Sequence, residues 1–402
     1  MSLNLVLNER PLKTHPLADW LGPEAAARTV LLTPPSVFAG ADGKARKAFA
    51  GWHTTPDYHG TITELLGAEM VLDLSIGRVG SLGEFDVLRA ARLRDMVGMP
   101  GQGFQAALRF RDKWRMKSIA REAGIAVPAM VLVEGVGTLP HRIGEIGLPA
   151  VVKPRWMAVG IGVKVVRDFS SCSEIMQLLS GHVRPFELMV EEFVDAPLWH
   201  VDGLMNDGVV LAAVASEDIL ATGAALLDED DPRAEPLIAA ADKVIAALGS
   251  PPHVHAFHAS FFMADTGGSA PVLCEISCRA GGLGVPATVE AATGINLRRE
   301  TVLGQLGLPA SPLSSGRIVS SGYIAMPARA GKLVAAPQSI PFDWVVSPVV
   351  RGRAGAVYSD ARAAAQIVMQ AAVVGSSRRE VRSRLDELAG WWNSETLWET
   401  PC

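Results

Sequence analysis

The sequence has few cysteines and no excess of positive charge. Among 402 residues there are four cysteines (Cys172, Cys274, Cys278 and Cys402), which are too few and too scattered for a disulfide framework. Their scarcity favours a reducing, cytoplasmic setting. The formal net charge of −5 excludes the basic surplus with which proteins bind nucleic acid or anionic membranes. We therefore expect small-molecule substrates as partners, without nucleic acid and without a membrane.

Long apolar segments and low-complexity tracts are also missing. The first 17 residues contain Asn8, Glu9, Arg10 and Lys13, so they lack the apolar core of a signal peptide. No apolar run reaches the roughly 18 residues that span a bilayer, and we find no internal repeat. The composition is 49% hydrophobic and 20% charged, which excludes a disordered chain. These features predict a soluble, intracellular protein of two or three domains, at roughly 150 residues per domain.

Strand-like and helical segments alternate over the first hundred residues. The run Thr29–Thr33 is short, apolar and β-branched, and two prolines follow it, which is typical of a buried strand. Residues 61–67 have a helical pattern, residues 70–74 indicate a second strand, and residues 85–97 form an amphipathic helix. This alternation predicts an α/β domain with a mostly parallel sheet.

The rest of the chain predicts an α+β organisation. A helix rich in lysine and arginine is expected at residues 109–123. The segments expected next are strands at 130–133, 150–153, 162–166 and 188–194, with a helix at 173–179. Further on, the expected elements are a strand at 209–215, a helix at 233–248, a hairpin of 256–263 with 271–276, and a final helix at 378–392.

Four segments with charged residues and glycines follow one another in a fixed order. They are Arg111-Asp-Lys113-Trp-Arg-Met-Lys117, Val151-Val-Lys153-Pro154 before Gly160-Ile-Gly162, Glu191-Glu192-Phe193-Val194-Asp195 before His200-Val-Asp202-Gly203, and Cys274-Glu275-Ile-Ser277-Cys-Arg279 before Gly281-Gly282. A single lysine is usually a solvated surface residue, and a lone Gly-x-Gly is a weak signal. The order and spacing of all four segments are what indicate a nucleotide site.

Each segment has residue types that suit a nucleoside triphosphate. Lysines from separate elements supply point charges for phosphates, and a glycine loop lets backbone N–H groups approach phosphate oxygens. Glu191 is suited to accept a hydrogen bond from the exocyclic amine of adenine. The carboxylate of Glu275 is suited to hold Mg²⁺. Arg279 is suited to stabilise the charge that develops during group transfer.

Three histidines next to these segments suggest an alternative, a zinc site. On a strand, His253 and His255 share one face while His258 points to the other, so a shared metal would need a bend. We favour the interpretation that His258 shares a face with Ser260, toward the active site. The two central cysteines do not have zinc-ligand spacing and are expected to pack in the core.

The four segments together resemble the ATP-grasp superfamily, and within it the carboxylate–amine ligases of the L-amino-acid ligase type. The resemblance runs from about Phe85 to Gly307, and the preceding residues are similar to the family's N-terminal domain in pattern only. It implies an α/β fold of three parts. These are an N-terminal parallel α/β domain at 1–110, a linker helix and small α+β lid at 111–194, and a C-terminal α+β catalytic domain at 195–402.

The resemblance also implies roles for individual residues. Lys153, on the lid, and Arg279 are implied to be catalytic, and Glu275 is implied to be a metal ligand. The implied nucleotide contacts are Lys113, Lys153, Gly160, Gly162, Glu191, Glu192, Phe193, Val194 and Asp202. The implied substrate contacts, which include the residues facing the site and the acceptor pocket, are His258, Ser260, Ser277, Arg279, Gly281 and Gly282.

The sequence departs from the family at the strands that bind metal. The family usually has a glutamate two residues after a histidine, where this chain has His258-Ala-Ser260, and Ser277 stands where asparagine is common. The lid loop at 155–159 is bulky and apolar where glycine and serine are usual. A glutamate expected on the ribose side is absent as well. Glu275 is therefore the main predicted protein ligand of Mg²⁺.

The reaction implied by the resemblance is amide-bond formation with ATP and Mg²⁺, with Mn²⁺ as an alternative ion. ATP and a carboxylic acid give an acylphosphate and ADP, and an amine then displaces phosphate. Two other interpretations stay open: an ATP-grasp carboxylase or carrier-dependent ligase, and a degenerate nucleotide-binding regulatory protein, which Ser260 suggests. Whether the chain forms a homodimer stays open too.

Overall fold

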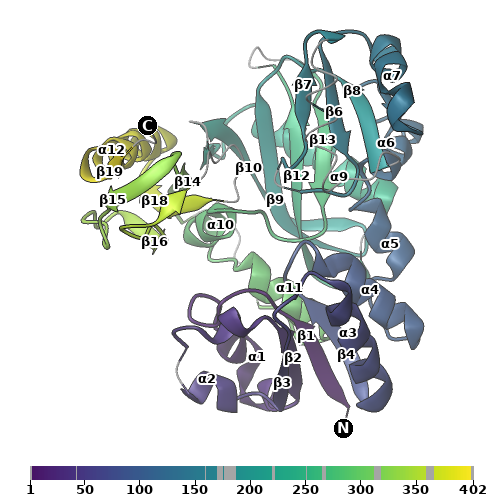
Figure 1. The fold of residues 1–402 in the computed structure, drawn as a ribbon, viewed down its shortest axis with the longest axis vertical. Helices are drawn as coiled ribbons and strands as arrows, with labels where there is room; N and C mark the ends of the chain where they lie inside the picture. Colours follow the sequence, from purple (N-terminus) through teal and green to yellow (C-terminus); the bar gives the residue numbers. More distant parts are fainter. Residues whose placement is uncertain are drawn as a thin grey trace.

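In the part of the chain that the structure describes, four β-sheets organise the fold, and one of them has eight strands. The computed structural model describes residues 2–41, 43–158, 160–169, 175, 187–219, 222–249, 251–264, 269–311, 318–358 and 366–399. Figure 1 shows an N-terminal α/β unit, a lid sheet beside the long central sheet, and a C-terminal lobe set to one side. No helix within these described ranges is long and apolar enough to span a bilayer.

The N-terminal unit is the predicted parallel α/β domain. Its strands are β1 (Leu3–Leu7), β2 (Thr29–Thr33), β3 (Gly51–Thr54) and β4 (Ile76–Ser81), which are parallel in the order β3-β2-β1-β4. Its helices are α1 (Leu17–Ala26), η1 (Pro35–Phe38), α2 (Gly43–Lys47), α3 (Thr61–Asp73) and α4 (Asp86–Met96). The strand predicted at 70–74 is wrong, because Met70 and Val71 are buried on the core face of α3. A short apolar run fits a buried helix turn as well as a strand, and β4 follows directly.

The linker consists of two helices, where the sequence predicts one. These are α5 (Phe104–Arg109) and α6 (Lys113–Glu122). Asp112 ends the break between them, since its Oδ1 accepts hydrogen bonds from the backbone N–H groups of Trp114 at 3.1 Å and Arg115 at 3.4 Å. An aspartate cap satisfies N–H groups that have no partner inside the helix. The break therefore places Lys113 at the first position of α6.

The lid is an antiparallel sheet in the order β5-β8-β6-β7. Its elements are β5 (Met130–Leu132), η2 (Val136–Thr138), α7 (Leu139–Ile146), β6 (Ala150–Pro154), β7 (Lys164–Val166) and β8 (Leu188–Glu192). The helix expected at 173–179 lies, apart from Ile175, outside the described residues. The lid strands expected from the sequence are confirmed, with ends that differ by a few residues.

The eight-stranded sheet forms the central body of the predicted catalytic domain and continues into the C-terminal lobe. Its order is β13-β12-β9-β10-β11-β14-β18-β16. The strands are β9 (Leu198–Asn206), β10 (Val209–Ile219), β11 (Gly223–Leu226), β12 (His255–Phe262), β13 (Val272–Ser277), β14 (Ser320–Pro327), β16 (Val345–Val350) and β18 (Ile367–Gly375). The expected hairpin is confirmed as β12 and β13, which pair antiparallel, while its turn at 265–268 lies outside the described residues.

Helices cover both faces of this sheet. One face packs on α6 and α9 (Ala234–Leu248) through Val201, Phe257 and Phe261. On the other face, Leu204 and Ala256 pack toward α10 (Val285–Thr293) and α11 (Leu297–Gln305). The same face also carries the polar residues described in the next subsection, so only part of it is apolar.

The C-terminal lobe adds a helix and a second small sheet. Helix α12 (Arg378–Glu395) buries Val381, Leu385, Leu388 and Trp392 against β14 and β18, which is helical spacing for one apolar face. The strands β17 (Val357–Tyr358), β15 (Gly331–Ala335) and β19 (Leu397–Glu399) form a three-stranded sheet. Because β14 and β18 belong to the central sheet, the lobe shares its hydrogen bonds with the central body.

Replacing Leu385 by alanine should destabilise the whole protein. Leu385 is fully buried, and removing a buried leucine costs about 2–5 kcal/mol of unfolding free energy. Denaturant unfolding should keep one transition, since the lobe and the body share one sheet. Leu397→Ala is the control, because Leu397 is 58% exposed and should cost less than about 0.5 kcal/mol. Two separate transitions would contradict the shared-sheet interpretation.

Candidate active site

The predicted site residues of the central sheet, together with His200, lie in two rows across one face. Strand pairing places Ser260 opposite Glu275 on one side and His200 on the other. The neighbouring row places His258 between Ser277 and Asp202. Side chains two residues apart on a strand point to the same face. The register therefore brings these six residues, from β13, β12 and β9, onto a common surface.

A buried glutamate and two lysines join α6 to the lid. Lys117 Nζ lies 2.8 Å from Glu191 Oε1, and Lys153 Nζ lies 2.6 Å from Glu191 Oε2. Burial favours a neutral carboxyl, yet Lys117 and Lys153 hold the pKa of Glu191 below its usual value. Burial and the neighbouring Lys153 lower the pKa of Lys117 to about 8. The stabilisation from Glu191 is thus present at neutral pH and is lost only as pH falls through its depressed pKa.

This arrangement gives Glu191 a role that the sequence does not predict. Both of its carboxylate oxygens pair with lysines, so the side chain positions Lys153 before any nucleotide arrives. Next to it, the N–H groups of Glu192 and Phe193 donate to Ala129 and Pro149. The N–H of Val194 has no partner among the described residues, so the backbone here offers a donor for an adenine edge. The Glu192 side chain is exposed on the far side.

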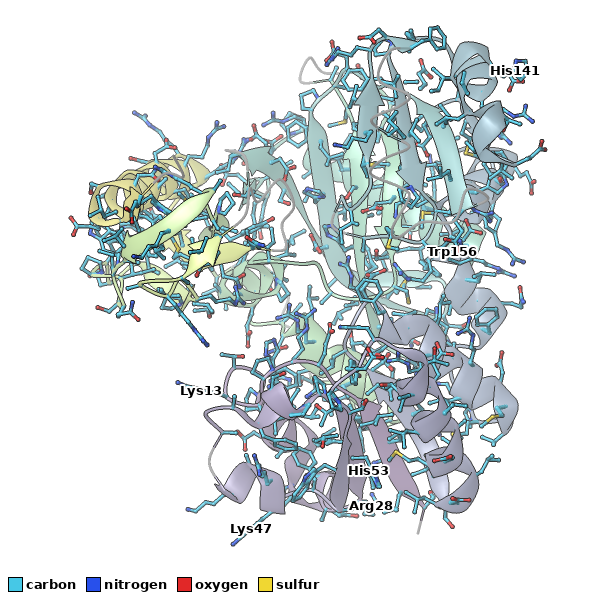
Figure 2. All side chains as sticks on the ribbon, viewed as in Figure 1. Lys13, Arg28, Lys47, His53, His141 and Trp156 are labelled. Carbon is cyan, nitrogen blue, oxygen red and sulfur yellow. The ribbon has the colours of Figure 1, made fainter. Side chains whose placement is uncertain are left out.

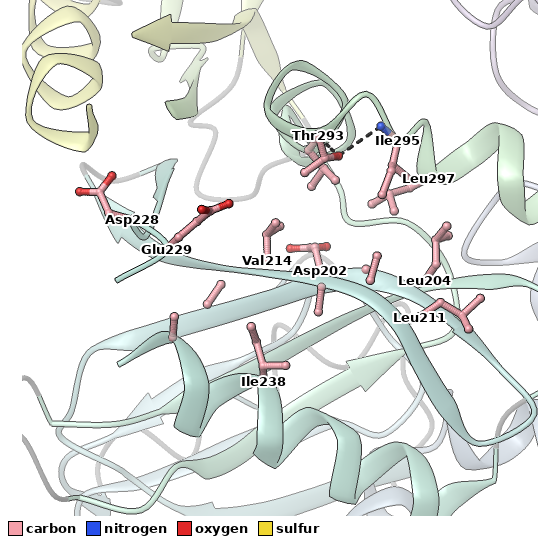
Figure 3. A pocket seen from close by; sticks show the side chains of 16 residues that line it. Asp202, Leu204, Leu211, Val214, Asp228, Glu229, Ile238, Thr293, Ile295 and Leu297 are labelled. Atoms are coloured by element: carbon pink, nitrogen blue, oxygen red, sulfur yellow. Dashed lines mark hydrogen bonds between the residues drawn. The ribbon is translucent and has the colours of Figure 1, made fainter. Parts of the chain in front are cut away.

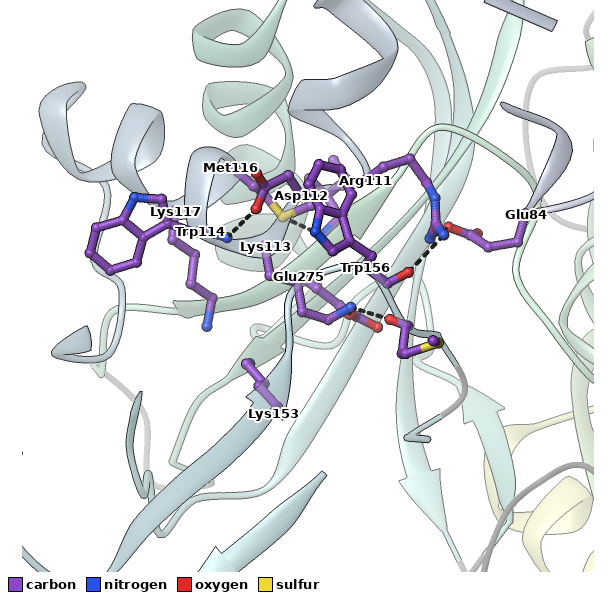
Figure 4. A network of polar contacts seen from close by, with 12 residues as sticks. Glu84, Arg111, Asp112, Lys113, Trp114, Met116, Lys117, Lys153, Trp156 and Glu275 are labelled. Atoms are coloured by element: carbon purple, nitrogen blue, oxygen red, sulfur yellow. Dashed lines mark hydrogen bonds and ion pairs between the residues drawn. The ribbon is translucent and has the colours of Figure 1, made fainter. Parts of the chain in front are cut away.

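Lys113 joins the lid loop to strand β13. Its Nζ donates to the carbonyl of Met157 at 2.6 Å and lies 3.2 Å from Glu275 Oε2. Burial would raise the pKa of Glu275, but Lys113 and Lys153 hold it well below the usual range. Figure 4 shows Lys113, Lys117 and Lys153 near Glu275.

The described part of the bulky lid loop lies against the start of α6. Figure 2 places Trp156 where the lid meets the linker helices. The Trp156 carbonyl accepts a hydrogen bond from Arg111 Nη2 at 2.9 Å, and Arg155 forms an ion pair with Asp112. Gly162 ends this loop with a φ of +77°, and a Cβ there would lie 2.8 Å from Pro154. Gly160, which also has a positive φ, is in the same loop. The described part of the loop therefore contacts the first turn of α6.

Glu84 connects the N-terminal unit to Arg279. One of its oxygens pairs with Arg111 and the other with Arg279. Burial would raise the pKa of Glu84, but Arg279 and Arg111 lower it below the usual value. Glu84 was not among the site residues predicted from the sequence. Its position indicated a role in the site, because Glu84 follows β4 at the carboxyl end of a parallel strand, where open α/β sheets bind ligands.

Two histidines form a stacked pair on the same surface. His258 Nδ1 lies 2.9 Å from Asp202 Oδ1. His200 bridges Ser260 Oγ at 2.9 Å and Asp218 Oδ1 at 2.8 Å. The two rings stack with centroids 5.0 Å apart. His200 and Asp218 were not among the predicted site residues, since the sequence motifs indicate no interaction partner for either residue.

The remaining histidines lie behind this surface. His253 and His255 meet edge to face, with ring centroids 5.3 Å apart, and His255 Nε2 lies 2.9 Å from the Cys278 carbonyl. These contacts give the two imidazoles partners different from that of His258. Among the described residues no group of three or more metal-binding side chains is found.

The glycines after Arg279 keep the surface open. A Cβ on Gly281 would lie 2.8 Å from Asp202 Oδ1 and 2.6 Å from Val285. Gly282 has free space around its Cβ position. A side chain at 281 would therefore displace the Asp202 carboxylate that holds His258.

A cavity of about 350 Å³ lies beside Asp202, at the edge of β10. In Figure 3, Asp228 and Glu229 lie at one end, and Ile295 and Leu297 face the strand from the other side. Three carboxylates and an apolar wall make this cavity suitable for an ammonium group on a small organic molecule.

Replacing Glu191 by glutamine should strongly destabilise the protein. The change leaves two buried lysines without their carboxylate, and breaking a buried ion pair from one side costs about 3–5 kcal/mol. Chemical denaturation measures the loss. Glu192→Gln is the matched control, because its side chain is exposed and should cost less than about 0.5 kcal/mol. Equal effects of the two substitutions would contradict the buried-pair interpretation.

Known proteins resemble this chain in sequence and in fold. No family model matches the chain. An L-arginine-specific L-amino acid ligase of Bacillus subtilis is 22% identical over 292 residues, which is 68% of each chain. A shorter match is the D-alanine–D-alanine ligase of Nitrosospira multiformis, which is 29% identical over 29% of this chain and 37% of its own length.

Solved structures match over nearly the whole chain. The L-amino acid ligase from Bacillus licheniformis superposes with a TM-score of 0.76 at 16% identity, covering 100% of this chain and 99% of that one. A carboxyaminoimidazole ribonucleotide synthase from Aspergillus clavatus, complexed with ATP, has a TM-score of 0.73 at 15% identity over 98% and 99%. The chain is therefore an ATP-grasp protein by fold, and the relatives that it matches include ATP-grasp carboxylate–amine ligases.

Proposed function

We propose that the protein is an ATP-dependent carboxylate–amine ligase that forms an amide bond through an acylphosphate, with release of ADP and phosphate. One observation carries the proposal: the positive charges of Lys113, Lys153 and Arg279, from three separate parts of the chain, all interact with the carboxylate of Glu275. Three cations around one carboxylate under a lid suit a transferring phosphoryl group and its metal ion. The ligase names of the relatives support the same reaction.

In the first step, a carboxylate oxygen of the acid attacks the γ-phosphorus of ATP. The bond from that phosphorus to the β–γ bridging oxygen breaks, and ADP leaves. Lys113 and Lys153 are placed to bind phosphate oxygens, and Arg279 is placed to stabilise the charge that develops on the transferring group. Glu191 and Glu84 hold these cations in position through the ion pairs given above.

In the second step, an amine nitrogen attacks the carbonyl carbon of the acylphosphate. The bond from that carbon to the phosphate oxygen breaks, and phosphate leaves. We assign the acidic cavity beside Asp202 to the amine, which is an ammonium ion before it reacts. The lid loop excludes water, because an acylphosphate hydrolyses readily. Amino acids or similar metabolites are the proposed substrates.

Glu275 fits the role of a Mg²⁺ ligand. Its side chain is 32% exposed and stands on the site face, and Mg²⁺ prefers oxygen ligands while keeping several waters. The ion, when bound, neutralises phosphate oxygens. Ser260 bonds to His200 and Ser277 is a hydroxyl, so phosphate and water would supply the other ligands. A cytoplasmic location and a homodimer belong to the proposal as well, as finer points.

An isotope experiment tests the proposed reaction. With ¹⁸O in the donor carboxylate and a panel of amino acids, ADP release should require both acid and amine. One ¹⁸O atom should appear in inorganic phosphate, because the phosphoryl group departs with the carboxylate oxygen. AMP release, or label retained wholly in the product, would show adenylation. ATP binding without ADP release for any pair would support the degenerate regulatory alternative.

Replacing Glu275 by glutamine should raise the Mg²⁺ concentration needed for ADP release sharply, or abolish release. The amide removes the charged ligand while keeping the size of the side chain. Thermal unfolding with ATP should lose its Mg²⁺-dependent shift, which gives a readout independent of turnover. Glu122→Gln, on the exposed surface of α6, is the control. An unchanged Mg²⁺ dependence in Glu275→Gln would move the metal site elsewhere.

A further inference from the structure

Four arginines from separate parts of the chain lie near enough to repel one another, Arg298 with Arg10 and Arg279, and Arg351 with Arg10. Arg10 follows β1, Arg298 is in the first turn of α11, Arg351 follows β16 in the C-terminal lobe, and Arg279 follows β13. Arg279 and Arg298 line one small cavity together with Ser81 and Gly83. We call this group of four the arginine cleft. Arg10 comes from the carboxyl end of a strand in the parallel sheet, which is the edge where open α/β folds bind ligands.

His15 contacts the arginine cleft as a neutral imidazole. Its Nε2 lies 3.0 Å from Arg298 Nη1, and its Nδ1 lies 3.0 Å from Thr14 Oγ1. The arginine donates to Nε2, so Nδ1 carries the proton and donates to Thr14. Burial, together with Arg298, Arg10 and Arg351, lowers the pKa of His15 to about 3. A histidine that stays neutral beside three arginines indicates a positive electrostatic potential around them.

Two of the four arginines, Arg10 and Arg279, have a carboxylate partner, and each of these carboxylates is shared with a second group. Glu9 lies 3.4 Å from Arg10 but also contacts His59 at 3.3 Å. Glu84 is shared between Arg279 and Arg111. Glu290, the acidic group nearest Arg298, accepts both of its hydrogen bonds from Asn296.

Arg298 and Arg351 are left without an acidic partner. No carboxylate among the described residues forms a salt bridge with either. Burial, with Arg10 and Arg279, lowers the pKa of Arg298 to about 9. The Nε of Arg10 is buried and has no hydrogen-bond partner within the described ranges. Clustered guanidinium groups that lack acidic partners form a site for an anion, since planar forks bind carboxylate and phosphate in pairs.

We propose that the arginine cleft binds a second anionic group of the acid substrate, a carboxylate or a phosphate monoester, while the reacting carboxylate lies at Arg279. The proposal rests on the ligase function and names its substrate class: acids that carry two anionic groups. The lysines of the proposed nucleotide site pair with Glu191 and Glu275, so ATP does not need the cleft. The acidic cavity beside Asp202 is left for the amine.

Matched acids test the proposal. Hydroxylamine serves as the amine, because it has no carboxylate of its own and makes the donor acid unambiguous. ADP release is compared for L-glutamate against L-glutamine and for O-phospho-L-serine against L-serine. The charged member of at least one pair should be preferred at least tenfold in kcat/KM, which is about 1.4 kcal/mol. Whether glutamate or phosphoserine is preferred separates carboxylate from phosphate recognition. Equal use of both members of each pair, or preference for the neutral ones, would overturn the proposal.

Two variants locate the effect. Arg298→Met and Arg351→Gln should each lower kcat/KM for the charged acid at least tenfold more than for its neutral partner. Arg351 is exposed, so its variant should fold even where Arg298→Met does not, and thermal unfolding checks both. Arg329→Gln is the control, because Arg329 is exposed and bonds to Asn393 in the C-terminal lobe. A preference that survives in Arg351→Gln and in a folded Arg298→Met would contradict the cleft.

A binding measurement separates this inference from the ligase function. If no acid supports ADP release, the proposed reaction is wrong. Calorimetric titration of glutarate and O-phospho-L-serine then tests, independently of turnover, whether the arginine cleft binds an anion. Binding to the wild type that weakens at least tenfold in Arg351→Gln supports the anion site. Absence of binding to the wild type, or equal binding to the variant, rules the site out.

Discussion

The buried carboxylate of Glu191 is the interaction on which the site depends. It stands on the lid strand β8 and holds Lys117 from α6 and Lys153 from the adjacent strand β6. Two lysines buried in one volume repel each other, and burial penalises each charge. A single carboxylate with two oxygens offsets both effects and fixes the distance between the cations. The lid, the linker helix and the phosphate-binding charge are therefore set by one ion-paired group.

Glu84 does the same for the other half of the site. It brings Arg111 of the linker and Arg279 of the catalytic strand onto the N-terminal unit. Each of these charge clusters joins parts that are far apart in the sequence, so their geometry depends on the packing of the whole fold. Buried polar groups of this kind are expensive unless every member is paired. This requirement explains why the linker helix breaks at Asp112, where the cap residue also binds Arg155 of the lid.

Sequence patterns predicted the elements with strong local signals. The strand β2, the helix α9 and the hairpin of β12 and β13 agree with the expectation because each has a clear period and clear ends. The run at 70–74 was mistaken for a strand because four apolar residues fit either period. The motif text led to Lys113, Lys153, Glu275 and Arg279, which the structure brings together.

The residues missed by sequence analysis are those whose partners are distant. Glu84 meets Arg279 across 195 positions, and Lys117 meets Glu191 across 74. Nothing near Arg10 or Arg351 in the sequence indicates that both belong to one cleft. Register decided the rest: pairing of β12 with β9 places His200 beside Ser260, and no local pattern encodes a cross-strand partner. Fold class is readable from periodicity, whereas charge partners need the topology.

A common feature of the described site is that its acidic groups already have partners from this chain. Glu275 pairs with Lys113, Glu191 with two lysines, Glu84 with two arginines, and Asp202 with His258. In the proposed reaction, phosphates that enter therefore exchange partners: a phosphate oxygen that binds Lys113 releases the carboxylate of Glu275 toward the metal ion. The cost of dehydrating these charges is met during folding, so the groups need little reorganisation when ATP binds. Arg298 and Arg351 differ because no carboxylate in the described part of the chain holds them, and this contrast separates the proposed nucleotide side of the site from the side proposed to select the acid.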